Sequence, residues 1–84
     1  MRITFGMRYD ADRLATRLVG YTERTKLTKI FLRLVGKAKN MEELDRLIAK
    51  AAAELSKNGN ERYAYGLMML KEALKKNLEA GRRV

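Results

Sequence analysis

Residues 40–57, NMEELDRLIAKAAAELSK, form the most regular segment of the sequence and decide its class. Asn40 can cap a helix, and Glu43 stands three residues later, where an acidic side chain completes a capping box. Apolar side chains then recur every three or four residues, which is the period of one helix face: Leu44, Leu47, Ile48, Ala51, Ala52 and Leu55. The segment therefore predicts an amphipathic helix that ends at residues 57–59.

A second amphipathic helix is predicted directly after this one. The sequence Asn-Gly-Asn at 58–60 supplies a tight turn, and the helical pattern beyond it runs to about Ala80, with Gly81 past its end. Its apolar positions again share one period: Tyr63, Ala64, Leu67, Met68, Leu70, Leu74 and Leu78. Because so short a connection leaves two helices side by side, we expect residues 40–81 to form an antiparallel helical hairpin.

Two shorter helices are predicted upstream, on either side of Gly20. Asp10 can cap the first, which ends near Gly20, and its apolar positions are Ala11, Leu14, Ala15 and Leu18. Thr22 or Thr25 can cap the second, which runs to about Lys39. Its apolar stripe consists of Leu27, Ile30, Phe31, Leu34 and Val35. In one continuous helix the two stripes would lie on roughly opposite faces, so the pattern favours a break at the glycine.

The first residues alternate instead of following a helical period. In residues 2–9, RITFGMRY, the apolar side chains fall on one side and the others on the opposite side, which is typical of a half-buried strand. An extended arm on the bundle or a frayed helix start remains an alternative. The expected fold class is therefore mainly α, with a short N-terminal β-strand followed by four helices in a single domain over residues 1–84.

The charge of the chain is large and unevenly distributed. Its 84 residues include 19 Lys and Arg against 10 Asp and Glu, for a net charge of +9. Residues 1–39 hold ten basic and three acidic side chains, whereas residues 40–84 hold nine and seven. This concentration favours nucleic acid or an acidic partner as the ligand of the N-terminal half. A chain this short also has a thin core, so we expect it to oligomerise.

The composition argues against catalysis. The chain has no cysteine and no histidine, which removes the thiolate nucleophile, the usual general base and the commonest metal ligand. Helix caps and solvated pairs account for the acidic residues, so we expect no enzyme, cofactor or metal. The sequence also lacks a signal-peptide apolar region and a run of about 18 apolar residues, which predicts a cytoplasmic protein with no membrane partner.

The order of elements over residues 2–38 resembles the ribbon-helix-helix DNA-binding family. In that resemblance FGMRY at 5–9 is similar to the family strand, and GYTERT at 20–25 is similar to the turn between its helices. The resemblance implies a homodimer in which two strands pair as an antiparallel ribbon and enter the major groove of double-stranded DNA. It also implies that the second helix meets a phosphate at its start.

Candidate binding residues follow from this arrangement. The ribbon face that does not pack on helices would present three side chains to the base edges: Arg2, Thr4 and Arg8. Hydroxyl and cationic side chains near the free amides of the second helix would bind a phosphate: Thr22, Arg24, Thr25, Lys26 and Lys29. Tyr65 and Met69, one turn apart and off the main apolar face, are either partner contacts or ordinary packing.

Two functions remain open at this point. The first is a homodimeric transcriptional regulator that binds DNA, with its C-terminal hairpin completing the dimer core or contacting a protein partner. The alternative is an all-α protein-interaction or RNA-binding module, in which residues 2–9 form an arm and the basic stripe from Lys26 to Lys37 meets an acidic protein or RNA. A solvated helix face is the simplest interpretation of that stripe.

Overall fold

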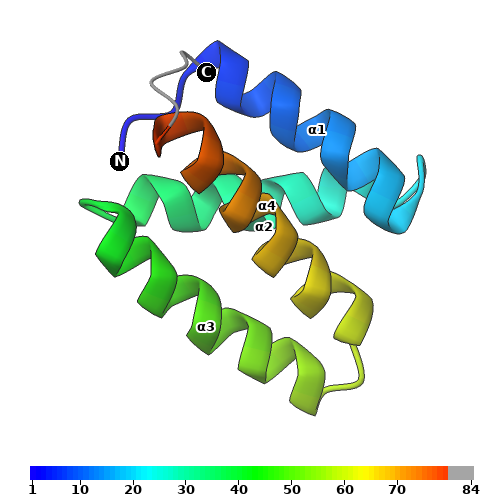
Figure 1. The fold of residues 1–84 in the computed structure, drawn as a ribbon. Helices are drawn as coiled ribbons and strands as arrows, with labels where there is room; N and C mark the ends of the chain where they lie inside the picture. Colours follow the sequence, from blue (N-terminus) through cyan, green and yellow to red (C-terminus); the bar gives the residue numbers. More distant parts are fainter. Residues whose placement is uncertain (80–84) are drawn as a thin grey trace.

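The computed structural model describes residues 1–79, which form four α-helices joined by short connections (Figure 1). The helices are α1 (Phe5–Val19), α2 (Arg24–Lys37), α3 (Met41–Lys57) and α4 (Glu61–Glu79). The sequence placed the end of the last helix at Ala80 and Gly81, and these two residues lie outside the described range. Helices α2, α3 and α4 therefore fall close to the segments with helical periodicity, whereas α1 begins before the expected cap at Asp10.

The α3–α4 hairpin forms where the local sequence signals agree. The Asn40 side chain accepts a hydrogen bond from the Glu43 amide at 2.8 Å, and the Glu43 carboxylate accepts one from the Lys39 amide at 2.9 Å. Gly59 has a φ of 82°, a left-handed conformation that glycine adopts without steric cost, and it turns the chain into α4. The two helices then run antiparallel and pack on each other (Figure 1).

The predicted β-strand over residues 2–9 is wrong, since the described part of the chain contains no strand and α1 already begins at Phe5. Thr4 caps α1 in place of Asp10: its hydroxyl accepts a hydrogen bond from the Met7 amide at 3.1 Å. From Met7 onward, buried side chains recur every four residues: Met7, Ala11, Ala15 and Val19. The helix satisfies its own backbone donors, whereas a lone strand would leave them unpaired. Residues 2–9 therefore do not form the β-ribbon that was expected to hold a homodimer together.

The break between α1 and α2 lies at Gly20. The sequence predicted it there, because the apolar stripes before and after this glycine would lie on opposite faces of one continuous helix. Gly20 has a φ of 93°, and its amide donates to the Thr16 carbonyl at 2.9 Å. The expected caps of α2 are wrong, however. Glu23 occupies the cap position without a side-chain cap bond, so neither Thr22 nor Thr25 caps the helix.

The core lies where the four helices meet. Its largest fully buried side chains come from α2, α3 and α4: Leu27, Val35, Leu44, Ile48 and Leu67. Helix α1 packs against α2 and α4 but not against α3, so α2 and α4 cross between α1 and α3 (Figure 1).

Candidate functional site

A cationic stripe runs along the exposed side of α2. It consists of four exposed side chains spaced three or four residues apart: Lys26, Lys29, Arg33 and Lys37. The opposite side of the helix buries Leu27, Phe31 and Val35 in the core. Because the buried side fixes the rotation of the helix, the stripe is held toward solvent.

A second group of cations lies on α1 and consists of Arg8, Arg13 and Arg17, all exposed. Arg13 and Arg17 are neighbours one turn apart on the outer side of the helix, whereas Arg8 lies on another side near its start. We call these three residues and the four of the α2 stripe the basic face. The two helices pack against each other along the chain (Figure 1). The seven cations are therefore carried by two helices that pack against each other.

No residue of the basic face forms an ion pair with a carboxylate within residues 1–79. The ion pairs of that range involve other cations: Arg24 with Asp12, Arg46 with Glu42, and Lys71 with both Asp45 and Glu72. Residues 40–79 contain seven basic and seven acidic side chains, so that half carries no net charge. The positive field of the described chain is consequently concentrated on α1 and α2.

The few carboxylates near the basic face are largely engaged elsewhere. Asp12 binds Arg24, and Glu23 accepts a hydrogen bond from the Tyr63 hydroxyl. This hydrogen bond raises the pKa of Tyr63 above its usual value, and the burial of the ring adds to the effect. Asp10 is the only other acidic residue before residue 40, and it is exposed. A polyanion approaching α1 and α2 therefore meets little opposing negative charge.

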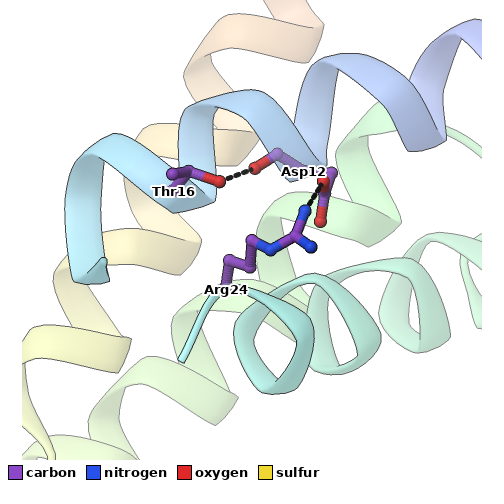
Figure 2. Close-up of polar contacts among 3 residues, drawn as sticks. All are labelled: Asp12, Thr16 and Arg24. Carbon is purple, nitrogen blue, oxygen red and sulfur yellow. Dashed lines mark hydrogen bonds and ion pairs between the residues drawn. The ribbon is translucent and has the colours of Figure 1, made fainter. Parts of the chain in front are cut away.

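Arg24 does not occupy the phosphate site that the sequence predicted for it. Figure 2 shows its side chain reaching from the start of α2 to the carboxylate of Asp12 on α1. The Thr16 hydroxyl donates to the Asp12 carbonyl oxygen at 2.8 Å, one turn along the same helix. The Arg24 guanidinium also lies over the Tyr21 ring, with 4.3 Å between Cζ and the ring centroid. Arg24 thus joins two helices and is only 28% exposed.

The other residues of the predicted phosphate site do not form a single cluster. Thr22, Thr25, Lys26 and Lys29 are all exposed. The cap residue between them is Glu23, whose negative charge disfavours an anion at the start of α2. Lys26 and Lys29 instead belong to the stripe along the helix, and the Lys26 Nζ lies 5.4 Å from the centroid of the Tyr63 ring.

The three predicted base-contacting residues are not aligned, because the strand that would align them is absent. Arg2 is exposed in the segment before α1, Thr4 caps the helix, and Arg8 is exposed on α1. Sequence reasoning missed Arg13 and Arg17 as candidates. A helical period extended back to residue 5 would have placed them on one side with Tyr9.

The predicted partner residues Tyr65 and Met69 lie on α4, away from the basic face. Tyr65 is 60% exposed, and Met69 is half-buried. Tyr65 borders a shallow groove between α3 and α4 that small side chains line, among them Ala49, Ala53 and Ala64. Contact with a protein partner here stays a prediction.

Other kinds of site find little support in residues 1–79. They contain no cluster of three or more acidic, histidine or cysteine side chains placed to bind a metal ion. None of their helices combines the length and apolar character needed to cross a membrane. Comparison of the chain with protein-family models, curated proteins and solved structures found no match.

Proposed function

We propose that this protein is a non-enzymatic, all-α module that binds nucleic acid through its basic face. The observation that carries the proposal is the set of seven exposed cations on α1 and α2, none paired with a carboxylate of residues 1–79. A phosphodiester backbone is a dense linear array of negative charge, and neutralising it releases condensed counterions. The basic face matches such a ligand in sign and in extent.

The length of the stripe supports contact with several phosphates. Helix α2 has 14 residues, and at about 1.5 Å per residue it spans roughly 21 Å. Its four cations are distributed from the first turn to the last, so they can follow a backbone instead of enclosing one anion. Since residues 1–79 contain no β-ribbon that could present a row of base-contacting side chains, we expect binding to depend on charge and salt more than on base sequence.

Direct binding measurements test the proposal. Fluorescence anisotropy with labelled oligonucleotides at about 0.15 M salt gives the dissociation constant of the wild-type chain. We expect Lys29→Gln/Arg33→Gln to weaken binding roughly tenfold, which corresponds to two exposed ionic contacts of up to about 1 kcal/mol each. The matched control is Lys50→Gln/Lys57→Gln, which removes two exposed cations from α3 and changes the net charge by the same amount.

The control decides how a loss of binding is interpreted. Selective weakening by the α2 variant supports the basic face as the site. Equal weakening by both variants would show that only the net charge matters and would overturn the proposal. Competition by polyglutamate as effective as that by nucleic acid would also overturn it, in favour of an acidic protein ligand.

A further inference from the structure

A row of aromatic and arginine side chains follows the outer side of α1. Starting at Phe5, every fourth residue belongs to it: Phe5, Tyr9, Arg13, Arg17 and Tyr21. The first four lie on α1, where side chains four residues apart are neighbours on one side of the helix. Tyr21 follows in the turn after Gly20. The row therefore places two cations of the basic face, Arg13 and Arg17, between rings at its two ends.

The three rings of this row are unusually open to solvent. Phe5 is 85% exposed, Tyr21 73% and Tyr9 56%. The chain has only two Phe and four Tyr, and the core uses just Phe31 and Tyr63. Burying a large aromatic side chain is favourable, so rings left uncovered at both ends of α1, Phe5 and Tyr9 at its start and Tyr21 after its end, indicate surfaces that a ligand covers.

Two of the rings are paired with guanidinium groups. The Arg13 Cζ lies 5.6 Å from the centroid of the Tyr9 ring, and the Arg24 Cζ lies 4.3 Å from that of Tyr21. The ion pair with Asp12 holds Arg24 in this place. Aromatic rings and guanidinium planes are the surfaces on which unpaired nucleobases stack. In a duplex the base faces are covered by neighbouring base pairs, so such rings gain little from it.

We propose that Phe5, Tyr9 and Tyr21 make this protein select nucleic acid with unpaired bases over duplex. The inference rests on the proposed function: the cations of the basic face bind the backbone, and the rings add base stacking. Single-stranded RNA and single-stranded DNA both offer this chemistry. The recognised feature is the unpaired base, and separate RNA and DNA probes distinguish the two sources.

The test compares three labelled probes with the full chain: an oligo-U RNA, an oligo-dT DNA and a duplex DNA, each about 20 nucleotides long so that one site is covered. We expect the wild-type chain to bind both single strands more tightly than the duplex. The variant Phe5→Ala/Tyr9→Ala should weaken single-strand binding by about fivefold or more per ring, while duplex binding changes less than about twofold. Circular dichroism checks that the helices of each variant are intact.

Tyr65→Ala is the matched control, because Tyr65 is about as exposed as Tyr9 but lies on α4. It should leave the affinity for all three probes unchanged. Tighter binding of RNA than of DNA would show that the 2′-hydroxyl is also recognised, and equal binding would show that stacking alone selects the ligand.

Two results would overturn the inference. One is a wild-type preference for the duplex, and the other is an equal loss of single-strand and duplex affinity in Phe5→Ala/Tyr9→Ala. In both cases nucleic acid still binds, so the proposed function stands without the stacking step. Failure of all three probes to bind would overturn the proposed function itself.

Discussion

Arg24, the first residue of α2, forms an ion pair with Asp12 in the middle of α1 (Figure 2). This contact crosses the turn at Gly20 and fixes the start of α2 against α1. It also places the guanidinium over Tyr21 instead of in solvent. The sequence predicted that Arg24 binds a phosphate. In the structure it instead holds a fixed position over the Tyr21 ring, at the edge of the proposed binding surface.

We predict that Asp12→Asn strengthens nucleic acid binding, because the amide oxygen can still accept a hydrogen bond from Arg24 beside Tyr21 but no longer neutralises its charge. The stability lost should be small, up to about 1 kcal/mol, because both partners of the pair are partly exposed. Asp10→Asn is the matched control, since it removes one negative charge from the same helix but leaves the ion pair between Asp12 and Arg24 intact. Anisotropy titrations should show a larger gain for Asp12→Asn, and an equal gain in both variants would contradict the assignment of Arg24.

The close contact between α4 and α2 leads to a second prediction. A methyl group at Gly66 would lie 2.6 Å from the Leu27 Cδ2 atom, and Leu27 is fully buried. Alanine gains about 1 kcal/mol of helix propensity over glycine, but overpacking a core costs about 1 to 3 kcal/mol. We expect Gly66→Ala to lower the free energy of unfolding by roughly 1 kcal/mol, measured by urea denaturation.

Gly36→Ala is the control for this prediction. A methyl group there meets only the Ile3 Cδ1 atom at 3.6 Å, an ordinary contact, and the position is exposed. The substitution should therefore raise the free energy of unfolding by up to about 1 kcal/mol. If both alanine variants were stabilised alike, the close packing of α4 on Leu27 would be wrong.

Much of the fold could be predicted where local and long-range signals coincide. Asn40, Glu43 and the apolar period of α3 all specify the same helix, and the glycine at 59 specifies its end. The apolar pattern of the residues before Asp10 is compatible with both a strand and a helix, because Met7 lies on the apolar side of either one. The helix prevails through packing of Met7 in the core, which no local pattern reveals.

The candidate site could be predicted only in part for the same reason. Lys26 and Lys29 are exposed because the buried side of α2 follows from its period. The position of Arg24 depends on Asp12, twelve residues earlier on another helix, and spacing along the chain does not reveal such a pair. The exposed row from Phe5 became visible only once residues 5–19 were known to be one helix.

The hydrogen bond from Tyr63 to Glu23 predicts a pH dependence of stability. The pKa of Tyr63 is raised from 10.0 by this hydrogen bond, with burial as the second cause. The folded chain holds the phenol proton more tightly than the unfolded chain. The resulting stabilisation is therefore complete below about pH 10. It is lost as the pH rises through the pKa that Tyr63 has in the folded chain.

We expect Tyr63→Phe to cost about 0.5 to 1.5 kcal/mol near neutral pH. The difference in unfolding free energy from the wild-type chain should shrink as the pH is raised from about 8 to about 11. Urea denaturation at each pH measures this difference in unfolding free energy. Tyr65→Phe is the exposed control, and its difference from the wild-type chain should not change with pH. A constant difference for Tyr63→Phe over this range would contradict the hydrogen bond.

The salt dependence of binding tests the central claim most directly, because it counts phosphate contacts. The logarithm of the binding constant should fall linearly with the logarithm of salt concentration, with a slope of about −0.7 per contact for single strands and about −0.9 for duplex DNA. For Lys29→Gln/Arg33→Gln the slope should be shallower by about 1.4 to 1.8, whereas Lys50→Gln/Lys57→Gln should keep the wild-type slope. An identical slope in all three proteins would contradict the basic face as the nucleic acid site.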